Sequence, residues 1–125
     1  MNLISFDQFQ QVDIRIGTVI KADVPEWSHW VIRMEVDFGP EIGKKKAFSG
    51  IMKFFKPEAL IGKQFPFVIN LEPKKIGPDK ELSEVMMIMA VPPPKATDGK
   101  LASEEETPTV LFKLQKKVSD GTKVR

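Results

Sequence analysis

Apolar and charged side chains alternate along residues 30–38. The apolar set is Trp30, Ile32, Met34, Val36 and Phe38. Charged side chains fill three of the positions between them, at Arg33, Glu35 and Asp37. This period of two predicts a β-strand with one buried face and one solvated face, and it places Trp30 in the core.

The same period begins earlier, at Asp13. We expect Ile14, Ile16 and Ile20 to point to one side of a first strand. Gly17 lies where such a strand must bend sharply if a small barrel is to close, because glycine tolerates a bulge or a close approach of backbone.

Two further strands are predicted after residue 38. One runs from Lys44 to about Met52, and the other has a face made of Phe65, Phe67, Ile69 and Leu71. Pro66 has no N–H to donate to a ladder, which favours an edge position for the second of these strands. Between them, residues 56–62 have proline early and glycine at the end, which predicts a short helix.

Residues 85–91 are apolar at every position, so a strand here has no polar face. A strand that is apolar on both sides is normally buried on both sides. A single small barrel has one interior, and the second face therefore needs a cover. We expect this cover to be either the N-terminal helix or a second subunit.

The two ends of the chain have their own signals. Ser5 followed by Gln8 forms a capping box, which predicts a short helix to about Val12 with Phe6 and Phe9 on its apolar stripe. Residues 92–108 are rich in proline, lysine and glutamate, and we expect a mobile surface loop there. Residues 109–114 predict a final strand, and residues 120–121 a turn.

Several short segments, in order along the chain, match one known family. They are residues 12–17, 49–51, 70–73 and 83–86, joined by 37–43, 55–61 and 120–124. Together they resemble the tRNA-binding domain, and the last three segments are most similar to its stand-alone CsaA branch. The resemblance implies a mainly β fold: a five-stranded OB-fold barrel with a short N-terminal helix, a short helix between strands 3 and 4, and a C-terminal strand extension. It covers nearly the whole chain apart from an insertion around residues 92–108, and we expect residues 1–125 to form one domain.

The resemblance also implies function. CsaA-like proteins are described as homodimeric, secretion-related chaperones, so the expected partners are unfolded or export-bound polypeptides, tRNA and a second copy of the chain. The alternative is a free-standing tRNA-binding protein that acts in trans with an aminoacyl-tRNA synthetase. Neither function needs a cofactor or enzymatic activity.

The net charge of +2 is too small to indicate nucleic acid, but its distribution is uneven. Residues 44–75 hold eight lysines and two glutamates, a balance of +6, and the rest of the chain carries −4. Such asymmetry can produce a basic face that attracts phosphate or an acidic peptide. An ordinary solvated lysine surface is the alternative.

Composition argues against catalysis and membrane insertion. There is no cysteine or tyrosine, and His29 is the single histidine, which we interpret as a surface or packing residue. No zinc, calcium or phosphate-loop motif is present, and Glu81 and Glu84 are interpreted as solvated loop residues. No apolar run approaches the ~20 residues of a membrane helix, and the N-terminus lacks signal-peptide character. We therefore expect a soluble, cytoplasmic protein.

The predicted ligand surface follows from how OB barrels bind, across strands 2 and 3 and between two gripping loops. Trp27 is expected to be exposed beside this surface, where aromatic rings and lysines suit unstacked bases or a peptide. The resemblance adds Asn70 and Ser83, although Val85 replaces a glycine of the family pattern. Methionines 86, 87 and 89 could either adapt to apolar ligands or simply fill the core. The full predicted set is Trp27, Arg33, Lys44, Lys45, Ser49, Asn70, Lys74, Lys75, Ser83 and Met86.

Overall fold

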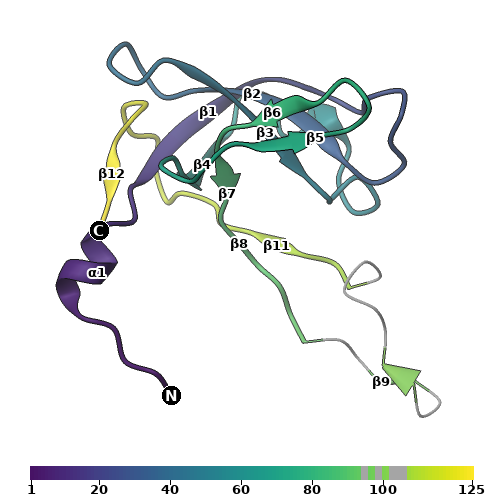
Figure 1. Ribbon diagram of the computed structural model, residues 1–125. Helices are drawn as coiled ribbons and strands as arrows, with labels where there is room; N and C mark the ends of the chain where they lie inside the picture. The colour runs from purple at the N-terminus through teal and green to yellow at the C-terminus, as the bar shows by residue number, and fades with distance from the viewer. Residues whose placement is uncertain (94–95, 98–99, 102–106) are drawn as a thin grey trace.

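The computed structural model of the protein describes residues 1–93, 96–97, 100–101 and 107–125. Its main sheet is antiparallel, with strands in the order β3-β2-β1-β4-β7 and with β12 also paired to β1 (Figure 1). The strands are β1 (Ile14–Asp23), β2 (Ile32–Asp37), β3 (Lys44–Ser49), β4 (Gln64–Val68), β7 (Met86–Met87) and β12 (Lys123–Val124).

The long strand β1 makes the barrel possible because it pairs on both sides. Residues 14–18 pair with β4, and residues 18–23 pair with β2. Gly17 lies at the changeover, where an added Cβ would stand 2.5 Å from Val36 Cγ1 and 2.6 Å from the Phe38 ring. Only glycine fits this approach. The close approach expected at Gly17 is therefore present, whereas the irregularity in the register of β1 lies further along, between Val19 and Lys21.

The barrel closes between β7 and β3. The backbone N–H groups of Glu84 and Val85, just before β7, donate to the carbonyl of Lys46 at 2.9 and 3.4 Å. Inside, Phe38 and Phe67 meet edge to face with centroids 5.4 Å apart. The 3₁₀ helix η1 (Pro57–Ala59) is followed by the buried Leu60, which joins the same core. The structure is thus mainly β and consistent with an OB-like barrel.

Smaller elements surround the barrel. The hairpin β5 (Lys74–Ile76) and β6 (Glu81–Ser83) lies against β3, while β8 (Met89–Ala90) pairs with β11 (Val110–Leu111). The pair β9 (Ala96–Thr97) and β10 (Lys100–Leu101) also runs antiparallel. Figure 1 shows the β8–β11 pair and helix α1 (Phe6–Gln10) leaving the barrel on the same side.

The N-terminal helix forms as predicted but covers nothing. Ser5 Oγ accepts a hydrogen bond from the Gln8 backbone N–H, and the Gln8 side chain accepts one from the Ser5 N–H, which confirms the capping box. No residue of α1 is buried, and Phe6 is 70% exposed. Of the two covers expected for residues 85–91, the N-terminal helix is therefore ruled out in the single chain, and a second subunit stays a prediction.

Residues 85–91 also differ from the prediction. The segment is divided into β7 and β8. Its side chains alternate over residues 85–87, where Val85 and Met87 are buried and Met86 is 52% exposed, whereas residues 88–90 are all half-buried. Because only one face reaches the barrel interior, the other remains open to solvent. Val91, just after β8, is exposed as well.

Three other expectations are corrected. Trp30 precedes β2, where alternation does not yet apply, and it is exposed rather than buried. Ile20 is only partly buried, and Val19 takes its place in the core, because the β1–β2 register shifts between Val19 and Lys21.

Pro66 lies in β4 between β1 and β7, not at an edge. Its carbonyl accepts the Ile88 N–H on the β7 side, and its opposite residue on β1, Ile16, bonds instead to residues of the C-terminal turn. The missing N–H therefore costs no bond to β1.

The C-terminal segments agree in part with the prediction. The final strand at 109–114 is shorter than expected, since only Val110–Leu111 pair. The turn at Asp120 and Gly121 is present, and Asp120 accepts hydrogen bonds from Thr18 and Gln64. Of the predicted mobile loop at 92–108, residues 94–95, 98–99 and 102–106 lie outside the described residues.

Candidate nucleic-acid and peptide interface

The outer face of β1, β2 and β3 carries a ladder of alternating charges. One rung joins Asp23, Arg33 and Phe48 across the three strands, and the next joins Lys21, Glu35 and Lys46. Such cross-strand neighbours interact directly, because their side chains leave the same side of the sheet. The basic side chains of this face therefore alternate with carboxylates.

Arg33 is held at the centre of this face by two carboxylates. Its Nε and Nη2 donate to the two oxygens of Asp23 at 2.9 and 2.6 Å, a bidentate pair, and its Nη1 donates to Glu81 Oε2 at 2.8 Å. The hydrogen bonds to Asp23 are the largest cause that raises the pKa of Arg33, and Glu81 adds to them against partial burial. The guanidinium stays charged, but its Nε, Nη1 and Nη2 atoms already donate hydrogen bonds to carboxylates.

Glu81 ties the β5–β6 hairpin to this face. Its Oε1 lies 3.3 Å from Lys46 Nζ, in addition to the contact with Arg33. Burial alone would raise the pKa of Glu81, but the hydrogen bonds from Arg33 and Lys46 outweigh it and hold the pKa below its ordinary value. Glu84 Oε2 accepts the Lys46 backbone N–H at 2.9 Å. The interpretation of Glu81 and Glu84 as merely solvated is therefore wrong.

An aromatic contact also packs the β5–β6 hairpin against the sheet, and we call this contact of Trp27 with Phe48 and Gly77 the hairpin seat. Trp27 lies with its ring centroid 6.4 Å from that of Phe48, and a Cβ at Gly77 would come within 2.5 Å of its indole. Trp27 is half-buried by this packing rather than fully exposed, while Trp30 is 57% exposed. Trp27 is thus more buried than predicted, and Trp30 more exposed.

The predicted lysines and serines fall at different depths. Lys44, Lys74 and Lys75 are exposed, and none of them forms an ion pair with another described residue; Lys45 is half-buried at the start of β3. Ser83 Oγ accepts the Phe48 N–H at 3.3 Å beneath the hairpin. Ser49 is buried opposite Ile32. Among the predicted site residues, the unpaired positive charge therefore lies on the hairpin and at the start of β3.

Asn70 and Met86 lie at another end of the barrel. Asn70 Oδ1 accepts the Asp13 N–H at 2.8 Å, and its Nδ2 donates to the Gln11 carbonyl at 2.6 Å. Met86 pairs with Val68, two residues before Asn70. Within the described part of the chain, neither residue forms a side-chain hydrogen bond with the group around Trp27 and Arg33.

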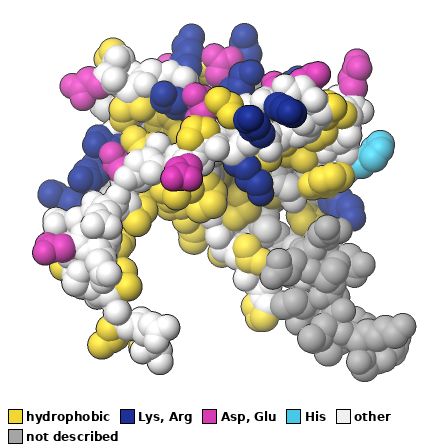
Figure 2. Space-filling view, in the orientation of Figure 1, with side chains coloured by type: hydrophobic (Ala, Val, Ile, Leu, Met, Phe, Trp, Pro, Cys, Tyr) yellow, Lys and Arg dark blue, Asp and Glu magenta, His cyan; other side chains and the backbone are white. Residues whose placement is uncertain are grey.

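Charge on this part of the surface is mixed. Figure 2 shows lysine and arginine side chains interspersed with acidic ones over the barrel, with apolar side chains gathered below. A cavity of about 440 Å³ opens beside the hairpin between Lys44, Lys45, Leu82 and Glu84. The basic balance of residues 44–75 is therefore offset by carboxylates from other strands.

Within the described residues, no group of three or more histidine, aspartate or glutamate side chains is placed to hold a metal ion. His29 is exposed in the loop before β2. None of the described helices is long and apolar enough to cross a membrane.

The family model described as "Putative tRNA binding domain" matches residues 14–123. The chain belongs to this tRNA-binding-domain family. The part of the chain that matches the family model spans every strand of the barrel, from β1 into β12. The resemblance found in the sequence is thereby confirmed.

Two solved structures of similar size share the fold of this tRNA-binding domain. The chaperone CsaA from Bacillus anthracis is 33% identical with a TM-score of 0.79, over 99% of this chain and 100% of that one. A MetRS-related protein from Pyrococcus horikoshii is 30% identical with a TM-score of 0.80, over 100% of both chains.

The tRNA-binding domain also matches part of much longer enzymes. The methionine–tRNA ligase of Parabacteroides distasonis is 34% identical over 122 residues, which make up 98% of this chain and 16% of that ligase. The chain thus spans only a small part of the curated relatives that it matches.

Sequence reasoning missed the residues that organise the interface. Phe48, Glu81 and Gly77 all contact predicted site residues, yet none was predicted. The sequence predicts that β2 and the lysine-rich strand β3 lie in one sheet, but it does not give the register between them. Only that register places Phe48 opposite Arg33. Nothing local in the sequence indicates that Glu81 folds back onto β2.

Proposed function

We propose that the protein is a cytoplasmic, non-catalytic tRNA-binding module that acts as a homodimer and also holds unfolded polypeptide. The observation that carries the tRNA part is the position of Lys74 and Lys75, which are exposed and unpaired among the described residues, on a hairpin seated against β3 of a tRNA-binding domain. Free lysines at this place can neutralise phosphates, whereas Arg33 and Lys46 are already paired.

The double variant Lys74→Glu/Lys75→Glu tests the tRNA site. We expect tRNA affinity to fall strongly, and removal of each lysine–phosphate interaction should flatten the log–log salt dependence by about 0.7–0.9. Filter binding or gel shift at two or more salt concentrations measures both quantities.

The matched control for this test is Lys116→Glu/Lys117→Glu. It changes the net charge equally at exposed positions near the C-terminus. If both double variants lose affinity equally, only general charge matters and the hairpin is not the site.

Polypeptide holding is supported by a separate observation. Trp30 and Met86 expose large apolar side chains, and the chain is similar over its whole length to a chaperone, CsaA. We expect Trp30→Ala to weaken suppression of client aggregation while leaving tRNA affinity nearly unchanged, because apolar contact drives the first activity and charge the second. Light scattering of a thermally unfolding client, beside tRNA gel shift, makes the comparison.

Trp27→Ala is the control for Trp30→Ala. Its ring is already packed against Phe48, so this change should disturb the hairpin seat and with it tRNA binding. Equal loss of both activities in both variants would contradict this division of roles.

The alternative is a free-standing tRNA-binding protein that serves an aminoacyl-tRNA synthetase in trans. Its support is the similarity to a MetRS-related protein and to segments of methionine–tRNA ligases. Stimulation of aminoacylation by the added protein, without any suppression of aggregation, would favour this alternative.

A further inference from the structure

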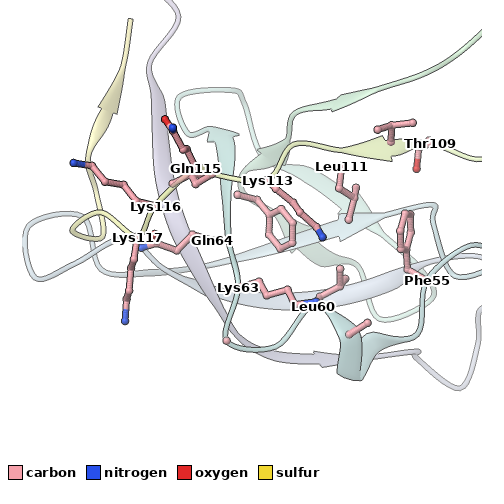
Figure 3. Close-up of a pocket in the computed structure, with 15 residues that line it drawn as sticks. Phe55, Leu60, Lys63, Gln64, Thr109, Leu111, Lys113, Gln115, Lys116 and Lys117 are labelled. Carbon is pink, nitrogen blue, oxygen red and sulfur yellow. The ribbon is translucent and has the colours of Figure 1, made fainter.

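A groove lies apart from the hairpin, between η1 with the start of β4 and the segment from β11 to residue 117. Its volume is about 870 Å³, which is within the usual range for ligand sites. Apolar side chains line it, among them Phe55, Leu60, Leu111 and Leu114. Figure 3 shows Leu111 and Lys113 extending from one wall toward Phe55 and Leu60 on the other.

All the charged side chains that line this groove are positive. Its basic residues are Lys63, Lys113, Lys116 and Lys117, and no aspartate or glutamate of the described chain lines it. None of the four lysines forms an ion pair with a described residue, in contrast to the paired charges on the outer face of β2 and β3. Uncompensated positive charge around an apolar floor is complementary to a ligand with acidic and apolar groups.

One wall also offers unpaired backbone. Strand β11 pairs with β8 through residues 110–111 only. Residues 112–117 make no backbone hydrogen bond to the rest of the described chain, and Val118 is the next residue to do so, through Gln64. Free N–H and C=O groups along a segment favour an extended polypeptide, which can add to them as a strand does.

These features favour protein over nucleic acid in the groove. Of the two phenylalanines in the lining, Phe65 is only 3% exposed and Phe55 is half-buried against the core, so neither presents a fully open ring face on which a base could stack. The floor is otherwise largely aliphatic, and single-stranded nucleic acid normally requires exposed aromatic platforms.

We propose that this groove binds an extended polypeptide segment in which acidic residues alternate with apolar ones. The apolar side chains pack between Phe55 and Leu111, which are both partly exposed in the groove, and the acidic ones reach Lys63 and Lys113 on opposite walls. The site is separate from the hairpin β5–β6 and does not depend on tRNA binding.

The probe is a fluorescein-labelled peptide of alternating leucine and glutamate, with a lysine-for-glutamate counterpart. Anisotropy should show saturable binding of the acidic peptide that weakens with added salt, and no binding of the basic one. Lys63→Glu/Lys113→Glu should raise the Kd about tenfold or more, since exposed charge pairs contribute modestly and reversal adds repulsion. The milder variant Lys63→Gln/Lys113→Gln should give a smaller increase and covers the case in which the first fails to fold.

Lys74→Glu/Lys75→Glu serves as the matched control. It should bind the acidic peptide like the parent protein, while Lys63→Glu/Lys113→Glu should bind tRNA like the parent. Equal binding of both peptides, or no effect of either groove variant, would overturn the proposal. Competition of tRNA with the peptide would assign the groove to nucleic acid, and a change of oligomeric state in the groove variants would assign it to a second copy; either result also overturns it.

Discussion

At the scale of single residues, Asn70 shows how a predicted ligand contact can have a structural task. Its amide bridges Asp13 N–H and the Gln11 carbonyl, and so fixes the chain between α1 and β1 to the end of β4. Its role in nucleic-acid binding stays a prediction. The structure adds an expectation about stability.

Asn70→Ala should lower the free energy of unfolding by about 1–2 kcal/mol, because it removes two hydrogen bonds of roughly 0.5–1.5 kcal/mol each. Urea unfolding measures the change. Asn2→Ala is the control, since Asn2 is exposed at the N-terminal end of the chain. Equal stability of the two variants would contradict the bridging role.

At the scale of elements, the β5–β6 hairpin is held to β2 and β3 by charge as well as by packing. Glu81 bonds to Arg33 and Lys46, and its pKa is lowered below the ordinary value of 4.5. A carboxylate with a lowered folded-state pKa contributes stability above its unfolded pKa, and this contribution is lost as pH falls through the folded pKa. The hairpin should therefore loosen in acid.

Glu81→Gln should make the protein less stable than the parent at pH 7, and the difference should shrink as the pH falls below 4.5. Denaturant unfolding across this pH range gives the comparison. Glu58→Gln, at an exposed position in η1, is the control; a constant difference at all pH values would refute the role of Glu81.

At the scale of the whole molecule, the exposed apolar surface is the property that needs explanation. Leu3, Ile4, Phe6, Val110 and Phe112 are all at least 45% exposed. Figure 2 shows apolar side chains on the underside of the barrel, on the side from which α1 and the β8–β11 pair extend. A second copy with twofold symmetry would cover such a surface.

Sedimentation equilibrium should therefore give about twice the 14.1 kDa of one chain, with an interface of roughly 1,200–2,000 Å². Phe6→Ser/Phe9→Ser should shift the equilibrium to monomer, because these side chains are exposed in the single chain and lie outside its described core. Leu82→Ser, at a similarly exposed position on β6, should leave the dimer intact. A monomeric parent protein would remove the dimer from the proposed function.

The sequence by itself determined what depends on local pattern. Alternation placed Ile32, Met34 and Val36 inside the barrel, the capping box placed α1, and glycine at position 17 marked an approach too close for a Cβ. Ordered short motifs were enough to indicate the family, because each is tied to a turn or strand end of the fold. These features need only neighbouring residues to be specified.

Tertiary structure decided everything that depends on register and on distant partners. A one-residue shift in β1 put Val19 rather than Ile20 in the core, and strand β2 began too late to bury Trp30. Folding of the hairpin onto β3 half-buried Trp27 and paired Arg33 with Glu81, 48 residues away along the chain. A local balance of +6 became a mixed surface because the carboxylates of Asp23, Glu35 and Glu81 come from other parts of the sequence, and Coulomb interactions depend on distance in space, not along the chain.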